Sequence, residues 1–146
     1  MADDGAPHPV HRYHARLHWS GSTGVGYHGY DRTHTASAPP AQADLTLASD
    51  PAFLGDPTLL LRRIDARPWR TFLAVAARAR IDVRSYEDEA EATMPEDDPP
   101  IRLTTIILRP RVVVGPGPTE ARVVHLLEVA HRECFIANSL RSEVRV

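Results

Sequence analysis

The sequence predicts a single α+β domain over residues 1–146. Three observations support this prediction. Residues 11–20 alternate apolar and polar side chains with the period of a strand, and residues 101–114 form a long β-branched run. Residues 119–134 instead repeat apolar side chains with the period of a helix. At 146 residues the chain is long enough to bury one core.

The N-terminal half is predicted to be mostly β structure. Its expected segments are a disordered lead-in over 1–10, a half-buried strand over 11–20, a glycine-marked hairpin turn over 21–29 with its return strand over 28–37, a short strand over 45–48 and a structured loop over 49–57. Trp19 belongs to the apolar face of the first strand, and Pro39 ends the return strand.

The middle of the chain contains one helix whose start is set by a proline. Pro68 has no backbone donor and its ring clashes one turn back, so a straight helix through it loses about 3 kcal/mol or more. A helix that starts near Asp65 places Pro68 in its first turn, where this cost is avoided. Phe72 and Leu73 then fall on its buried side.

The C-terminal half predicts two strands, a second helix and a last short strand. The expected segments are a strand over 81–94, an acidic hairpin loop over 95–100, a strand over 101–114, a helix after Thr119 and a strand over 141–146. Thr119 is a typical N-cap residue. The apolar stripe of this helix, which faces the core, consists of Val123, Leu127, Ala130 and Cys134.

The polar side chains do not form a recognisable metal or cofactor site. Glu87, Glu89 and Glu91 share one face of their predicted strand, which is typical of a solvated face rather than a metal site. The eight histidines show none of the spacings that zinc sites use. The glycines at 21–29 lead into a strand, not into the helix N-terminus that binds a phosphate. We therefore predict no metal and no cofactor.

Composition and charge argue against several classes of partner. A net charge of -2 and an aromatic content of 6% do not favour nucleic acid. No apolar run approaches the ~20 residues of a membrane span. The acidic N-terminus lacks the apolar core of a signal peptide, and one cysteine cannot form an internal disulfide. We predict a cytoplasmic protein with no nucleic-acid or membrane partner.

Cys134 is the one cysteine of the chain, and it ends the predicted C-terminal helix. Its place in the apolar stripe is typical of a packed, inert thiol. The helix dipole disfavours a thiolate at this end, whereas His131 and Arg132 in the same turn favour one. A thiol so placed suits a resolving cysteine, which attacks a sulfenic acid or disulfide, better than a primary nucleophile. Both interpretations remain open from the residues alone.

Several segments form a recognisable series along the chain. They are residues 19–34, with W-S-G and G-Y-D-R-T-H; residues 49–57, S-D-P-A-F-L-G-D-P; residues 86–91, Y-E-D-E-A-E; and residues 131–139, H-R-E-C-F-I-A-N-S. In order and spacing they resemble the OsmC-like branch of the OsmC/Ohr family of stress-induced thiol peroxidases. The likeness covers nearly the whole chain.

This resemblance implies an OsmC-like fold, in which curved antiparallel sheets from two subunits wrap two central helices in an intertwined homodimer. It also implies an active site at the dimer interface that reduces organic hydroperoxides. In the family a peroxidatic cysteine lies on the first central helix, a resolving cysteine lies on the second, and lipoyl-type dithiols recycle the disulfide. Cys134 matches the resolving position. Arg32 matches an arginine common in this branch and is a candidate contact of the thiolate or substrate.

The first central helix departs from the family pattern. Arg67 stands at the position of the peroxidatic cysteine, Pro68 at that of its histidine neighbour, and Thr58 at that of a glutamate. A guanidinium cannot act as a nucleophile at neutral pH, and a threonine cannot orient an arginine as a carboxylate does. The resemblance thus implies a degenerate active site in which Arg67 is not catalytic and the two-cysteine cycle cannot run.

Alternatives remain for the cause and for the function. Residues 62–70 record either true divergence or a local reading-frame error, since the family pattern returns from Thr71 onward. We predict a stress-response protein with impaired reduction of organic hydroperoxides. The rivals are a non-catalytic protein that binds a small apolar ligand, and a one-cysteine redox protein in which an external thiol reduces oxidised Cys134. We also expect Pro68 to shorten its helix and weaken the dimer.

Overall fold

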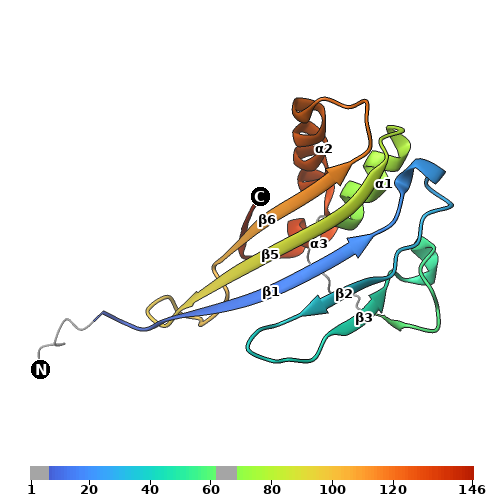
Figure 1. The fold of residues 1–146 in the computed structure, drawn as a ribbon. Helices are drawn as coiled ribbons and strands as arrows, with labels where there is room; N and C mark the ends of the chain where they lie inside the picture. The colour runs from blue at the N-terminus through green and yellow to red at the C-terminus, as the bar shows by residue number, and fades with distance from the viewer. Residues whose placement is uncertain (1–6, 62–68) are drawn as a thin grey trace, which may run out of the picture.

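One seven-stranded sheet with helices packed on one of its faces forms the fold (Figure 1). The computed structural model describes residues 7–61 and 69–146. The strands lie in the order β4-β3-β2-β1-β5-β6-β7. Their bounds are β1 Val10–Ser20, β2 His34–Ser37, β3 Leu45–Ala48, β4 Leu60–Leu61, β5 Val83–Pro95, β6 Thr105–Val114 and β7 Glu143–Arg145. The helices are α1 Trp69–Arg78, α2 Glu120–Glu133 and α3 Phe135–Ser139, with 3-10 turns η1 Thr23–Val25 and η2 Pro51–Phe53.

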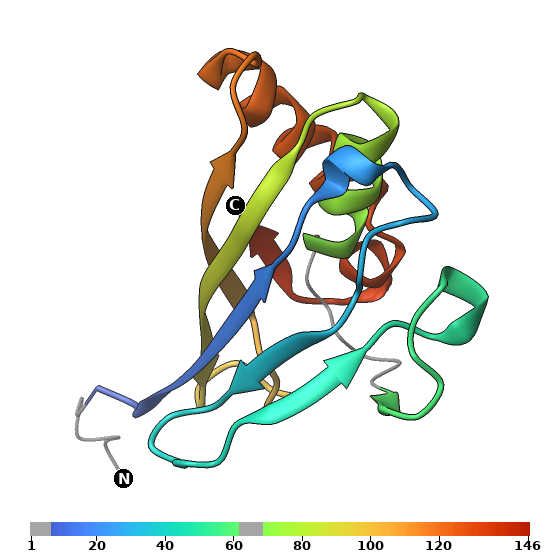
Figure 2. The same cartoon turned by 45° about the vertical axis from the view of Figure 1, so that its right-hand side comes forward.

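The sheet is antiparallel in its centre and parallel at both edges. β1 pairs with β2 and β5, and β5 pairs with β6, all antiparallel. The two edge pairs, β3 with β4 and β6 with β7, are parallel. This architecture is the mixed α+β arrangement that the sequence predicts. Figure 2 shows α1, α2 and α3 on the same face of the long central strands.

The core fills the space between the sheet and the two longer helices. Trp19 on β1 and Tyr86 on β5 are paired across the strands and are almost completely buried. Trp69 and Phe72 from α1 pack against Tyr86, with ring centroids 6.4 and 5.9 Å from its ring. From α2, Leu126 and Ala130 are buried in the same core. Rings from both layers therefore hold α1 against the sheet.

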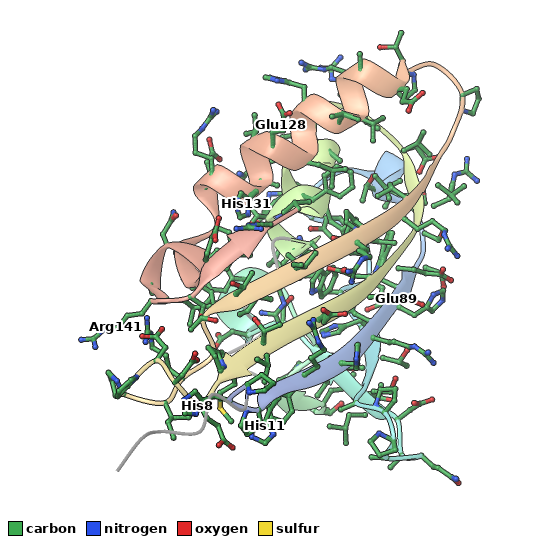
Figure 3. The ribbon with its side chains drawn as sticks, turned by 90° about the vertical axis from the view of Figure 1, so that its left-hand side faces the viewer. His8, His11, Glu89, Glu128, His131 and Arg141 are labelled. Atoms are coloured by element: carbon green, nitrogen blue, oxygen red, sulfur yellow. The ribbon has the colours of Figure 1, made fainter. Side chains whose placement is uncertain are left out.

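The opposite face of the sheet is charged, as the acidic run of β5 predicts. In Figure 3 Glu89 projects away from α2. Basic side chains from both neighbouring strands form ion pairs with the β5 glutamates: Glu87 with His18 and Arg111, Glu89 with Arg16, and Glu91 with Arg12 and Arg109. We call these eight residues the charge ladder. Each exposed pair contributes about 1 kcal/mol or less, so the ladder marks the solvent side more than it stabilises the fold.

Two expectations for the N-terminal half need correction. The return strand is β2, at His34–Ser37, and is shorter than the predicted 28–37. The preceding glycine-marked segment is not a tight hairpin turn, because it contains η1 and a longer loop. Thr23 in η1 explains the difference, since its buried hydroxyl donates to the Ile81 carbonyl at 2.6 Å and accepts from the Val83 N–H at 2.8 Å. These bonds hold η1 against the start of β5.

The region before α1 was only partly predicted. α1 is described from Trp69 onward, so the expected start near Asp65 and the place of Pro68 lie outside the described residues. β4 was not predicted, because a two-residue strand has no periodicity to detect. Phe72 and Leu73 are buried as expected.

The C-terminal helix follows the prediction closely. Thr119 is the N-cap, and its hydroxyl accepts from the Arg122 N–H at 3.3 Å. Val123 and Leu127 pack partly buried against the core and Ala130 is fully buried, so the predicted stripe faces inward. The helix ends at Glu133, however, one residue before Cys134. No helix of the described residues combines the length and apolar character that a membrane span requires.

Candidate functional site

A cavity of about 240 Å³ lies where four parts of the chain meet. α1 forms one wall, and the loop before β2, the η2 turn and the junction of α2 with α3 form the others. The lining combines aromatic rings, a thiol and guanidinium groups; its principal side chains are Tyr27, Tyr30, Arg32, Phe53, Arg78 and Cys134. Such an apolar pocket with a few polar groups is the usual form of a small-molecule site.

Cys134 lies at the break between α2 and α3. Its backbone is extended, with φ -70° and ψ 105°, which interrupts the helix after Glu133. The Cys134 N–H donates to the His131 carbonyl at 3.3 Å, and the Cys134 carbonyl accepts from the Asn138 N–H at 3.0 Å. The residue is 3% exposed and its thiol is free. The two flanking helices thus fix the thiol in the cavity wall.

Arg32 is a buried cation held by neutral partners. It is 5% exposed, and its guanidinium donates to the carbonyls of Tyr30 at 2.8 Å and Tyr27 at 2.6 Å. The guanidinium carbon also lies 3.9 Å from the Tyr30 ring centroid and 5.1 Å from that of Tyr27. Carbonyl dipoles and π faces therefore replace part of the hydration that burial removes.

The loop that presents Arg32 is fixed from two sides. The Trp19 indole N–H donates to the Asp31 carbonyl at 2.7 Å, which ties the loop to β1. The Asp31 carboxylate accepts from both the N–H and the hydroxyl of Thr33, at 2.9 and 2.7 Å. The Tyr30 ring meets the Trp19 ring edge-on at 6.2 Å. Arg32 consequently has little freedom to leave the cavity.

Tyr30 stays a neutral phenol in this setting. Burial raises its pKa above the ordinary value, and the positive charges of Arg32 and Arg78 only partly oppose that effect. A neutral hydroxyl can donate a hydrogen bond, whereas a phenolate cannot.

One face of α1 lines the cavity along its length. Arg70, Ala74 and Arg78 recur at four-residue spacing and all contribute to the wall. Eight residues of helix span about 12 Å, so the cavity extends along roughly two turns. Arg70 also donates to the Ala48 carbonyl at 3.1 Å, which joins α1 to β3.

The predicted site residues can now be placed. The structure brings Cys134 and Arg32 to one cavity. Arg67 lies outside the described residues, although Trp69 and Arg70, which follow it closely, line the same cavity. Across residues 7–61 and 69–146, no three His, Cys, Asp or Glu side chains gather closely enough to hold a metal ion.

Comparison with known families gives a match to the model of the OsmC-like proteins over residues 70–146, which is more than half of the chain. The chain belongs to the OsmC-like family. The matched part includes α1 from Arg70 onward, the long strands β5 and β6, and the α2–α3 junction with Cys134. No curated protein matches the chain.

Solved structures of OsmC-like proteins share this fold. An OsmC-like protein of unknown function from Vibrio cholerae O1 biovar eltor has a TM-score of 0.52 at 23% identity, over 96% of this chain and 97% of its own. An OsmC-like hydroperoxide resistance protein from Jannaschia sp. CCS1 has a TM-score of 0.52 at 18% identity, over 88% of this chain and 85% of its own. The expected OsmC-like fold of the subunit is therefore confirmed, and the homodimer remains a prediction.

Several residues of the OsmC-like cavity were not predicted from the sequence. Tyr27 and Tyr30 lie beside Arg32 in the loop. Arg78, in the last turn of α1, places its guanidinium carbon 4.5 Å from the centroid of the Tyr27 ring. Phe53 and Phe135 stack at 6.5 Å, although 82 residues separate them in the chain. These contacts arise from tertiary packing. Only the clustering of Tyr27, Tyr30 and Arg32 within six residues was visible beforehand.

Proposed function

We propose that this OsmC-like protein acts in the defence against organic hydroperoxides, with Cys134 as its one reactive thiol. The observation that supports the proposal is the position of Cys134 in the wall of a largely apolar cavity that also contains Arg32. Family membership supports it, and so does the printed description of one structural neighbour as a hydroperoxide resistance protein.

The proposed reaction uses one cysteine. The Cys134 thiolate attacks one oxygen of the hydroperoxide, the O–O bond breaks, and the alkoxide leaves as an alcohol after it takes a proton. Cys134 becomes a sulfenic acid. An external lipoyl-type dithiol then attacks the sulfur, water leaves, and the second thiol of the reductant releases Cys134 as the reductant closes to its cyclic disulfide.

The cavity supplies what this reaction needs besides the thiol. Arg32 lines the same cavity, and its guanidinium is a charged group that can stabilise the thiolate and the developing alkoxide. The aromatic walls accommodate the apolar part of the peroxide and limit access of water.

We propose that this activity is impaired relative to a two-cysteine enzyme. The chain has one cysteine, so no intrachain disulfide can form after the first step. By the family pattern Arg67 occupies the position of the peroxidatic cysteine. If resequencing of the codons for residues 62–70 recovered a cysteine, the two-cysteine cycle would be restored and the reason for impairment removed.

Sulfenic acid trapping tests the proposal. Wild-type protein treated with one equivalent of cumene hydroperoxide should bind one equivalent of a dimedone-type probe, and Cys134→Ser should bind none. Hydroperoxide consumption with a lipoyl dithiol should be slow in the wild type and should fall to the protein-free rate in Cys134→Ser. Absence of labelling, or equal consumption by both proteins, would refute the role of Cys134.

Binding without catalysis is the second candidate. Phe53 and Phe135 line the cavity, are more than half exposed and stack on each other, as a contact surface for an apolar ligand requires. In that case an apolar ligand raises the melting temperature equally in the wild type and in Cys134→Ser, and sulfenic acid trapping fails in both.

A further inference from the structure

The alkoxide that the proposed reaction releases needs a proton inside the cavity. When the Cys134 thiolate attacks a hydroperoxide, the O–O bond breaks and the departing oxygen carries a negative charge. An alkoxide is a much stronger base than a phenolate or a carboxylate, so it leaves slowly unless a positioned acid protonates it. The side chains that line the cavity decide which group can supply this proton.

Most polar groups of the described lining are unsuited to this step. A guanidinium holds its protons too tightly, and an exposed carboxylate such as Glu133 accepts protons instead of donating them. The hydroxyls of Ser49 and Thr71 are about as weakly acidic as the alcohol product, so they offer no driving force. The phenols of Tyr27 and Tyr30 remain as candidates.

Tyr30 has a closer cationic neighbour than Tyr27. The guanidinium carbon of Arg32 lies 3.9 Å from the Tyr30 ring centroid and 5.1 Å from that of Tyr27. Tyr30 is also 6% exposed, whereas Tyr27 is only partly buried. Burial raises the pKa of Tyr30 and keeps its proton in place at rest, and the charges of Arg32 and Arg78 oppose this effect. The same charges stabilise a tyrosinate once the proton has left.

The Tyr30 ring is fixed in the cavity wall with its hydroxyl hydrogen unused. The ring meets the rings of Trp19 and Tyr27 edge-on, with centroids 6.2 and 6.5 Å away. The hydroxyl donates no hydrogen bond to any residue that the structure describes. Packing therefore positions the phenol, and its O–H remains available to a molecule bound in the cavity.

We propose that Tyr30 is a catalytic residue, the general acid that protonates the alkoxide released when Cys134 attacks a hydroperoxide. The O–H bond of the phenol breaks as the O–H bond of the alcohol forms, and a tyrosinate is left beside Arg32. The external dithiol then supplies two protons. One joins the hydroxide released from the sulfenic acid to form water, and the other returns to Tyr30 as Cys134 departs as a thiolate. This inference rests on the proposed function, because it concerns the proton transfer of the same reaction.

Two oxidants whose leaving groups differ in basicity test the proposal. Cumene hydroperoxide releases an alkoxide, which needs a proton, whereas perbenzoic acid releases a benzoate, which does not. The rate of Cys134 oxidation by each oxidant is measured in a single turnover, by quenching with a dimedone-type probe. Tyr30→Phe removes the hydroxyl and keeps the ring. Tyr13→Phe is the matched control, because Tyr13 is 50% exposed on β1 and does not line the cavity.

Tyr30→Phe should slow oxidation by cumene hydroperoxide about 100-fold or more, and oxidation by perbenzoic acid should stay within about threefold of the wild type. Tyr13→Phe should change neither rate, and thermal melts verify that both variants are folded. An unchanged rate with cumene hydroperoxide, or an equal loss with both oxidants, would overturn the role of Tyr30 and leave the proposed function intact. If neither oxidant reacts with Cys134 in the wild type, the proposed function fails and the role of Tyr30 fails with it.

Discussion

Thr23→Val tests whether one buried hydroxyl holds the cavity loop in place. The Thr23 side chain is 1% exposed, donates to the Ile81 carbonyl and accepts from the Val83 N–H. Valine has nearly the same shape, so the change removes both hydrogen bonds without opening a cavity. Each of the two buried groups left unsatisfied costs about 1–3 kcal/mol, which predicts a loss of about 2–6 kcal/mol in the free energy of unfolding.

Urea unfolding at fixed protein concentration measures this loss. A protein of this size has a urea m-value of about 2 kcal/mol/M, so the midpoint should fall by about 1–3 M. Thr23→Ser keeps the hydroxyl and should cost about 1 kcal/mol, for one lost methyl group. Thr35→Val, on the exposed side of β2, should stay within about 0.5 kcal/mol of the wild type. If Thr23→Ser is destabilised as much as Thr23→Val, the hydroxyl is not what holds the loop.

Two further changes give expectations of a different kind. Gly55→Ala should destabilise the protein, because its Cβ would stand 1.7 Å from the Ser49 carbonyl oxygen and force the backbone beside the cavity to move; an unchanged melting temperature would contradict this. Asp82→Asn should reduce the acid sensitivity of the fold. Hydrogen bonds from Ser22, Arg84 and the Gly24 N–H help to hold the pKa of Asp82 below its ordinary value, against desolvation. Its stabilising contribution is therefore full above the unfolded pKa near 4 and is lost as pH falls through the lower folded pKa. Melting temperatures of wild type and variant should converge as the pH is lowered below 4, and a constant difference would refute the linkage.

Local sequence patterns were sufficient to predict the elements whose structure is determined by their own residues. The strand at Val10–Ser20 follows from strict alternation, and the β3 strand at Leu45–Ala48 has its predicted bounds. Thr119 caps α2 as its residue type predicts. In these places propensity, pattern and packing agree.

Elements that depend on distant contacts could not be predicted. No glycine or proline marks the helix break at Cys134, and the apolar stripe continues through it, so the sequence pattern does not predict the break. The proximity of Arg78 to Tyr27 follows from how α1 packs on the loop, 51 residues away in the chain. The sequence and its resemblance pointed to Cys134 and Arg32, but the composition of the cavity required the fold.

The charge ladder on β1, β5 and β6 restricts how this subunit can assemble. To cover that face, a partner would have to strip water from eight charged or titratable side chains that already satisfy one another, and desolvation of each ion costs several kcal/mol. A second copy of the chain would not offset this desolvation cost, because the charges of the ladder are already paired within one subunit. We therefore expect any subunit interface to form over the helices or along a sheet edge, next to the cavity. Ligand binding in the cavity of one subunit would then change contacts with the other subunit.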